Sequence, residues 1–162
     1  MSEPLRARIE QMLRAHGVAT LATSGPEGPW AAAVFYASDQ DLNLVFVTDP
    51  GTRHGRDLAA GGRAAAAIHA QASGWSEIRG LQIEGAVRQV AAAGRPAALA
   101  IYLEKFPEIR RVSEAPRDDA ERGLQRRLAS IALWRLAPAM IRVIDNRERF
   151  GWKQELRLTA PG

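Results

Sequence analysis

The stretch LVFVTDPGTRHGRDL, residues 44–58, says most about the fold, because a buried strand turns directly into a helix within it. The apolar run ends at Thr48, the Asp-Pro-Gly sequence at 49–51 predicts a tight turn, and a short helix is expected over about 53–60. Free backbone N–H groups and the positive end of the helix dipole allow such a turn to bind an anion. An ordinary capped helix after a strand would have the same sequence, so the stretch alone leaves both interpretations open.

Four side chains of this stretch are suited to a phosphate group. Thr48 and Thr52 carry hydroxyl donors, and Arg53 can hold a phosphate through two N–H groups at once. His54 adds a donor or a charge, depending on its protonation state. Gly51 lets the backbone approach a ligand closely.

The rest of the chain predicts many strands and few helices. Runs of apolar and β-branched residues bounded by turn residues predict strands over 18–24, 30–38, 42–48, 64–70, 78–90, 133–145 and 153–158. Apolar residues at helical spacing predict a helix over 4–15. Further helices are expected over about 53–60, closed by Gly61-Gly62, over 96–106, ended by Pro107, and from Asp118 or Asp119 to about Ser130. Gly80 and Gly85 interrupt the alternation of 78–90 and indicate a bulge or bend in that strand. This balance favours a mainly β, α+β chain with an antiparallel barrel rather than a parallel sheet.

Composition favours one domain with an apolar core. The chain has 162 residues, of which 46% are hydrophobic, and we expect a single domain over 1–162. No apolar run approaches the roughly 20 residues that span a membrane, and the N-terminus lacks the apolar segment of a signal peptide. We therefore expect a cytoplasmic protein with no membrane partner. Cysteine is absent and the three histidines are far apart, so no metal site is expected.

The basic charge does not by itself indicate a nucleic-acid partner. The net charge is +4, which is compatible with a phosphate, a nucleotide or a nucleic acid as ligand. Basic residues are interspersed with acidic ones, and the strands are rich in Ala, Val and Leu. Single-stranded nucleic acid would require aromatic and basic residues on a strand face. We therefore expect no nucleic-acid partner.

Several motifs together resemble one known family. A strand, a Thr, a short turn and a Ser/Thr-Arg-Lys/His triplet at 48–54 resemble the phosphate-binding segment of the FMN-binding split barrels related to pyridoxamine-phosphate oxidase. AIYLEKFP (100–107) resembles the Tyr-Leu-x-x-Phe-Pro helix of this superfamily. IRGLQIEGAVRQV (78–90), AMIRVIDN (139–146) and FGWKQELRL (150–158) resemble, in the same order, a group of uncharacterised bacterial members. The resemblance covers about residues 5–158.

The resemblance implies an antiparallel split β-barrel of six or seven strands that forms a homodimer, with FMN in two grooves at the interface. It implies as cofactor-binding residues Thr48, Thr52, Arg53, His54, Gln82, Trp152 and Lys153. The first four would hold the FMN phosphate, and Gln82 would reach the isoalloxazine or ribityl edge. Trp152 and Lys153 would approach the flavin, either within one subunit or from the partner.

Two departures limit what the resemblance implies. Many relatives carry Lys where this chain has His54, which is a weaker and pH-dependent cation. The chain ends in RLTAPG and lacks the Arg-x-His substrate motif of the oxidase proper, so vitamin B6 oxidation is not carried over.

The function that these observations predict is an FMN-dependent oxidoreductase whose substrate and catalytic residues the sequence does not identify. FMN carries out such chemistry without a protein nucleophile, and no nucleophile motif is present. Three alternatives stay open. A haem-binding barrel would use His54 or His69 as axial ligand, a deazaflavin would share the ring and the phosphate-bearing tail of FMN, and a non-catalytic module would bind a nucleotide.

Other aromatic and histidine side chains are assigned to structure. Trp30, Trp75 and Trp134 are expected in the barrel core or at the dimer interface, and His69 in the core or an interface.

Overall fold

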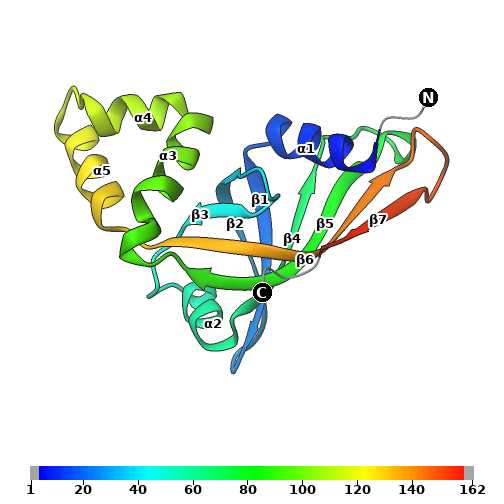
Figure 1. The fold of residues 1–162 in the computed structure, drawn as a ribbon, viewed down its shortest axis with the longest axis horizontal. Coiled ribbons are helices and arrows are strands. Elements are labelled where there is room, and N and C mark those ends of the chain that lie inside the picture. Colours follow the sequence, from blue (N-terminus) through cyan, green and yellow to red (C-terminus); the bar gives the residue numbers. More distant parts are fainter. Residues whose placement is uncertain (1–3, 159–162) are drawn as a thin grey trace.

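Seven strands form one antiparallel sheet in the computed structural model, which describes residues 4–158. They are β1 (Val18–Gly25), β2 (Gly28–Ser38), β3 (Leu44–Val47), β4 (Arg63–His69), β5 (Arg79–Gln89), β6 (Leu133–Asp145) and β7 (Lys153–Arg157). Their order is β3-β2-β1-β4-β5-β6-β7, and a pairing of β3 with β6 closes the first six into a barrel (Figure 1). The chain therefore has the antiparallel split β-barrel of the α+β class that the sequence predicts.

Strand β6 joins the barrel to the seventh strand. Its residues 133–136 pair with β3, and its residues 140–144 pair with β7. On its other edge β6 pairs with β5, where the register shifts between Glu84 and Gly85, so the predicted bulge is present. A Cβ atom at Gly85 would lie 2.0 Å from the carbonyl oxygen of Ala137, so the close approach of the two strands there requires glycine.

Two helices pack their apolar faces on the barrel core. They are α1 (Leu5–Ala15) and α2 (Arg53–Gly61). Ile9 and Leu13 of α1 are fully buried, and Leu58 of α2 is 1% exposed. In Figure 1 α1 lies above the barrel and α2 below it. Both helices were predicted, α1 from the spacing of its apolar residues and α2 from the turn before it and the glycine pair after it.

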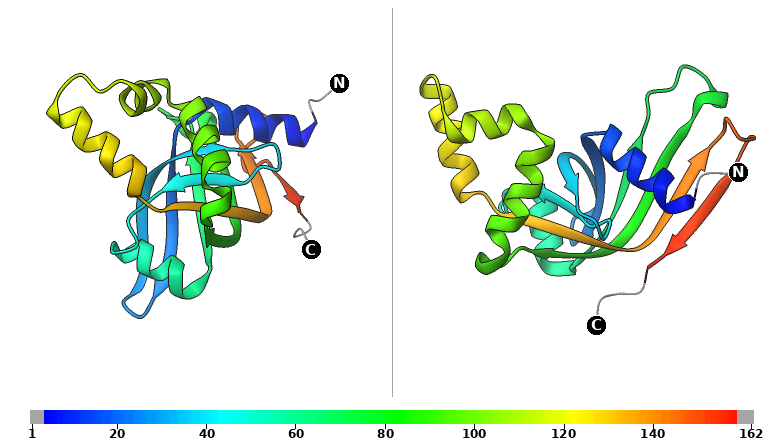
Figure 2. Two further views of the ribbon diagram at one scale, coloured as in Figure 1. Left: turned by 60° about the vertical axis from the view of Figure 1, so that its left-hand side comes forward. Right: turned by 45° about the horizontal axis from the view of Figure 1, so that its top comes forward.

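Three further helices form an arm that extends to one side of the barrel, as Figures 1 and 2 show. They are α3 (Arg95–Lys105), α4 (Pro107–Glu114) and α5 (Asp119–Ser130). The sequence predicts α3 and α5 but not α4, because Pro107 was interpreted only as the end of α3. Proline also suits the first turn of a helix, and Pro107 begins α4. Within residues 4–158 no helix is long and apolar enough to cross a membrane.

Lys105, the last residue of α3, ties the arm to the barrel. Its Nζ atom donates to the carbonyl oxygens of Leu13 and His16 at the end of α1, both at 2.7 Å. The same ammonium lies 3.8 Å from the centroid of the Tyr36 ring. Burial lowers the pKa of Lys105 to about 8.

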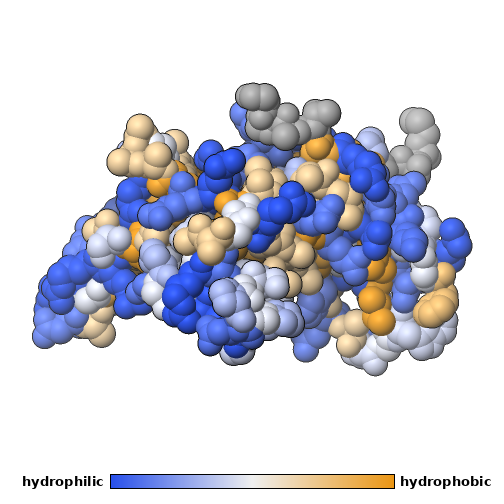
Figure 3. All heavy atoms as spheres, turned by 90° about the horizontal axis from the view of Figure 1, so that it is seen from below, coloured by the Kyte–Doolittle hydropathy of each residue, from blue (hydrophilic) through white to orange (hydrophobic). Residues whose placement is uncertain are grey.

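The outer face of the barrel is unusually apolar on three neighbouring strands. Ala22 of β1 pairs with Ala31 of β2 and with Ala65 of β4, and all three side chains are exposed. One end of β1 and β2 adds Val18 and Phe35, which are 46% and 54% exposed. In the view from below in Figure 3, apolar residues are concentrated toward the middle of the molecule, among hydrophilic ones.

Candidate functional site

Hydrogen bonds hold the turn between β3 and α2 on both sides. The Thr48 N–H donates to the carbonyl oxygen of Ala132 at 3.2 Å, and the Trp134 indole donates to the Thr48 carbonyl oxygen at 3.2 Å. Trp134 is 2% exposed and belongs to the core, as predicted. Thr52 is the N-cap of α2, where its Oγ1 accepts from the Gly55 N–H at 3.1 Å. The strand-turn-helix that the sequence predicts is therefore present and rigidly held.

Three of the four predicted phosphate-binding side chains converge at this turn. His54 Nε2 lies 2.6 Å from Thr48 Oγ1 and 3.3 Å from Thr52 Oγ1, and the two hydroxyl oxygens are 3.5 Å apart. We call these three residues the hydroxyl–imidazole cluster. Burial lowers the pKa of His54 below its usual value of 6.5, and the opposing effect of Asp57 is smaller. The lowered pKa favours the neutral imidazole, which contributes to the cluster through hydrogen bonds.

The fourth residue, Arg53, extends to the hairpin between β1 and β2. Its Nη2 atom donates to the carbonyl oxygen of Glu27 at 2.7 Å and approaches that of Pro29 at 3.4 Å. The guanidinium carbon lies 4.5 Å from the centroid of the Trp30 ring. The Nε atom is buried and has no hydrogen-bond partner in the described part of the chain. Arg53 is thus held at Nη2, while its Nε–H donor has no hydrogen-bond partner among the described residues.

The other predicted cofactor residues lie on different elements. Gln82 projects from the outer face of β5, where its Oε1 accepts from Arg142 Nη1 at 3.2 Å. Lys153 is exposed on β7, opposite Ile144. Trp152 packs against the core instead, under the guanidinium of Arg8 at 5.1 Å. Figure 1 shows β7 and α2 well apart, so one chain does not bring Trp152 or Lys153 to the cluster.

Two further side chains lie beside the turn. Trp30 was expected in the barrel core or at the dimer interface; its 44% exposure excludes the core, and its contact with Arg53 was not predicted. Asp57 is 6% exposed and accepts from Thr23 Oγ1 at 2.8 Å, which ties α2 to β1. Both contacts join residues that are more than twenty positions apart, so no local pattern could reveal them.

His69 is the other histidine that was predicted as a candidate axial ligand of haem. It was expected in the core or an interface; its side chain is exposed on the outer face of β4, which excludes the core. Its Nδ1 atom lies 3.3 Å from the carbonyl oxygen of Ala70, and Nε2 contacts no hydrogen-bonding group within residues 4–158. The alternation of β4 explains the difference, because His69 follows the buried Ile68 and must face outward.

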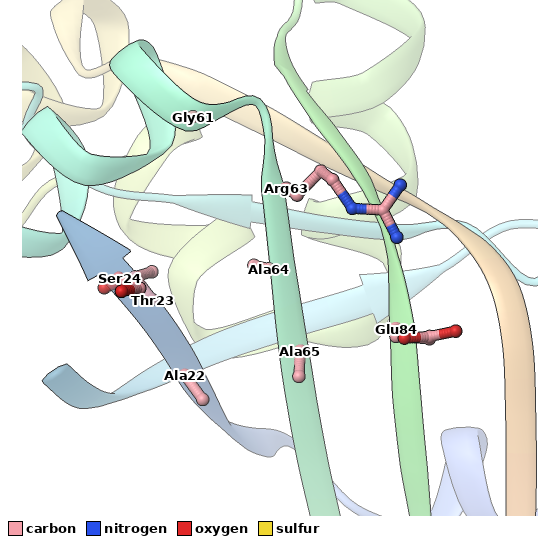
Figure 4. A pocket seen from close by; sticks show the side chains of 8 residues that line it. All are labelled: Ala22, Thr23, Ser24, Gly61, Arg63, Ala64, Ala65 and Glu84. Atoms are coloured by element: carbon pink, nitrogen blue, oxygen red, sulfur yellow. The ribbon is translucent and has the colours of Figure 1, made fainter. Parts of the chain in front are cut away.

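A recess of about 470 Å³ lies at the other end of α2 (Figure 4). Its wall includes Ala22 and Ser24 of β1, Ala65 of β4 and Gly61 at the end of α2. In Figure 4 the side chain of Arg63 extends toward strand β5, and Glu84 lies on that strand. None of the predicted cofactor residues lines this recess.

Comparison with known proteins agrees with this fold. The family model described as Pyridoxamine 5'-phosphate oxidase matches residues 5–139. A UPF0306 protein of Klebsiella pneumoniae is 28% identical over 155 residues, which cover 95% of this chain and 94% of the relative.

Two solved structures show the same fold at low sequence identity. A heme binding protein from Mycobacterium smegmatis superposes with a TM-score of 0.70 at 22% identity over 97% of this chain, which spans 60% of that protein. A pyridoxamine 5'-phosphate oxidase-related, FMN binding protein from Nostoc punctiforme gives a TM-score of 0.63 at 15% identity, and the match covers 98% of each chain. Since the family model spans most of the sequence, the chain belongs to the pyridoxamine 5'-phosphate oxidase family, as its sequence motifs predicted.

Proposed function

We propose that the protein binds FMN, with the phosphate group at the turn between β3 and α2, and acts as a flavin-dependent oxidoreductase. The observation that carries this proposal is the convergence of Thr48, Thr52 and His54 at a helix start, next to an arginine with an unsatisfied donor. Hydroxyl groups, an imidazole and a guanidinium are all donors that phosphate oxygens accept. The printed description of the structural neighbour from Nostoc punctiforme as FMN binding supports the same cofactor.

The residues at the turn fit a phosphate for a second reason. The first N–H groups of a helix have no partner inside the helix, and here Thr52 Oγ1 satisfies that of Gly55. The N–H groups of Arg53 and His54 remain for a ligand, together with the positive end of the helix dipole. A buried Arg53 Nε without a partner costs free energy, which a phosphate oxygen would offset.

The chain's own residues would bind and orient the cofactor. FMN, when bound, supplies hydride or electron transfer at its ring. The hydroxyl–imidazole cluster would hold the phosphate end through the hydroxyl groups of Thr48 and Thr52 and the imidazole of His54. Gln82 and Lys153 are exposed hydrogen-bonding side chains on the outer sheet face and would contact the ring end.

A homodimer would bring these two parts together. Within one chain Lys153 lies away from the cluster, whereas a two-fold partner could place its own β7 beside the turn. The exposed row of Ala31, Ala22 and Ala65 is an apolar surface that a second copy would cover. Light scattering tests this part of the proposal: a mass of twice 17.6 kDa supports it, and a mass of 17.6 kDa contradicts it.

The first experiment is an absorbance spectrum of the purified protein before and after incubation with FMN and desalting. Flavin bands that stay with the protein would support the proposal. A protein that stays colourless and does not quench FMN fluorescence at high protein concentration would refute it. Riboflavin, which lacks the phosphate, is the matched ligand that isolates the contribution of the turn.

Haem is the second candidate, and His69 favours it. Within residues 4–158 the His69 Nε2 atom has no hydrogen-bond partner and lies on an exposed, alanine-rich face of β4, and an apolar surface beside an imidazole suits a porphyrin with an axial histidine. The printed description of the neighbour from Mycobacterium smegmatis as heme binding points the same way. A Soret band on adding haemin, lost in His69→Ala but kept in His54→Ala, would move the assignment to haem.

A further inference from the structure

Trp30 holds the guanidinium of Arg53 from one side. The residue lies near the start of β2, and the Arg53 carbon is 4.5 Å from the centroid of its ring. This distance is typical of a cation–π contact. The ring is 44% exposed, so the contact lies at the surface of the protein and not in the core.

The hairpin backbone holds the same guanidinium from another side. Arg53 Nη2 donates to the carbonyl oxygen of Glu27 at 2.7 Å, with those of Pro29 and Gly28 at 3.4 and 3.5 Å. All three contacts use Nη2, so they leave the Nε donor unsatisfied.

A second arginine fastens the hairpin to the turn independently. Arg56 Nη1 donates to the carbonyl oxygen of Gly51 at 2.7 Å, and Nη2 lies 3.3 Å from Glu27 Oε2. Arg53 and Arg56 therefore both link the hairpin tip to the first turn of α2. An arginine at the start of a surface helix would otherwise sample many rotamers, and ordering it would cost free energy when a ligand binds.

We propose that Trp30 is a positioning residue for phosphate recognition, because its ring and the hairpin carbonyls fix Arg53 before a ligand arrives. The inference rests on the proposed function and adds to it the element that prepares the arginine. Trp30 does not touch the phosphate in this scheme. It acts through Arg53, so its effect must be confined to ligands that carry a phosphate.

The test compares FMN with riboflavin in titrations that follow flavin fluorescence. Trp30→Leu removes the ring face and should weaken FMN binding by about two- to fivefold, the usual worth of a surface cation–π contact. Riboflavin binding should not change. Trp30→Phe keeps an aromatic face and should recover part of the FMN affinity. Trp75→Leu is the matched control, because Trp75 is also exposed but packs edge-on against Phe150. It should change neither affinity.

Equal losses for FMN and riboflavin in Trp30→Leu would overturn the inference, since a general loss of structure would explain them. Unchanged FMN affinity would overturn it as well.

If the native protein binds neither flavin, the proposed function fails, and the inference is then tested with inorganic phosphate as the probe. The NMR signal of the Arg53 Nε–H group should shift as phosphate is added, with a weaker response in Trp30→Leu. A signal that does not respond to phosphate, or responds equally in the two proteins, would refute the role of Trp30.

Discussion

Replacing Gly85 by alanine is expected to destabilise the barrel at one defined point. The added Cβ would lie 2.0 Å from the Ala137 carbonyl oxygen, 2.7 Å from its carbonyl carbon and 2.8 Å from the Pro138 Cα. All three are backbone atoms of β6, so no side-chain rotation can relieve the overlap. The two strands must separate at the bulge, where the register between Glu84 and Gly85 already shifts.

The size of the effect follows from this geometry. Overpacking a rigid site costs about 1–3 kcal/mol, and the backbone contacts here place Gly85→Ala in the upper part of that range, at about 2–3 kcal/mol. For a chain of this length, each kcal/mol lowers the melting temperature by roughly 2–4 °C, so we expect a fall of about 4–12 °C.

Thermal and urea unfolding followed by circular dichroism measure both quantities. Gly123→Ala is the matched control, because Gly123 lies inside α5 and nothing stands within 4 Å of the added Cβ. It should raise stability by about 0.5–1 kcal/mol, the helix propensity difference between the two residues. If Gly85→Ala melts at or above the temperature of the native protein, the close approach of β5 and β6 is not as described.

Three further predictions concern the site and the arm. Arg53→Ala should weaken FMN binding roughly ten- to hundredfold, as expected for a lost hydrogen bond to a charged group, and should leave riboflavin affinity unchanged. Equal affinities of native and variant protein for FMN would exclude Arg53 as a phosphate ligand. Thr48→Val keeps the shape of the side chain but removes the hydroxyl oxygen that lies 2.6 Å from His54 Nε2. Titration should show that the affinity for FMN falls about fivefold. An equal fall in the affinity for riboflavin would contradict a phosphate role. The pKa of Lys105 is about 8 in the folded chain and 10.5 in the unfolded chain. Between pH 8 and pH 10.5 the unfolded chain therefore binds more protons than the folded one. The free energy of unfolding should rise with pH in this range. The measurement is urea unfolding between pH 8 and pH 10, below the ordinary tyrosine value of 10.0, and a rise of the same size in Lys105→Met would count against this origin.

The elements of the fold could be predicted because each has a local signature. The alternation of 78–90, the glycines within it and the apolar spacing of 4–15 all predicted the observed structure. Helix α4 was missed because Pro107 both follows the end of α3 and begins α4. A proline is common at either position, and the sequence alone does not distinguish them.

The site could be predicted only where it is local. Thr48, Thr52 and His54 lie within seven residues, and the helix start brings them together. The contact of Arg53 with Trp30 and the position of Trp152 under Arg8 depend on pairings across the barrel. The periodicity of a sequence does not indicate which distant strand or helix a side chain contacts, so only the structure identifies the partners of Arg53 and Trp152.

The closure of the barrel through β3 and β6 has a consequence for access to the site. Four residue pairs join these strands, whereas eleven residues of β5 pair with the other edge of β6. Thr48 is the next residue after the last of these four pairs, and its N–H donates to Ala132 just before β6 begins. A strand pairing with few hydrogen bonds opens more readily than a long one. Amide exchange should therefore be faster along the β3–β6 pairing than along the β5–β6 pairing, and any ligand that bridges Thr48 to the start of α2 should slow it.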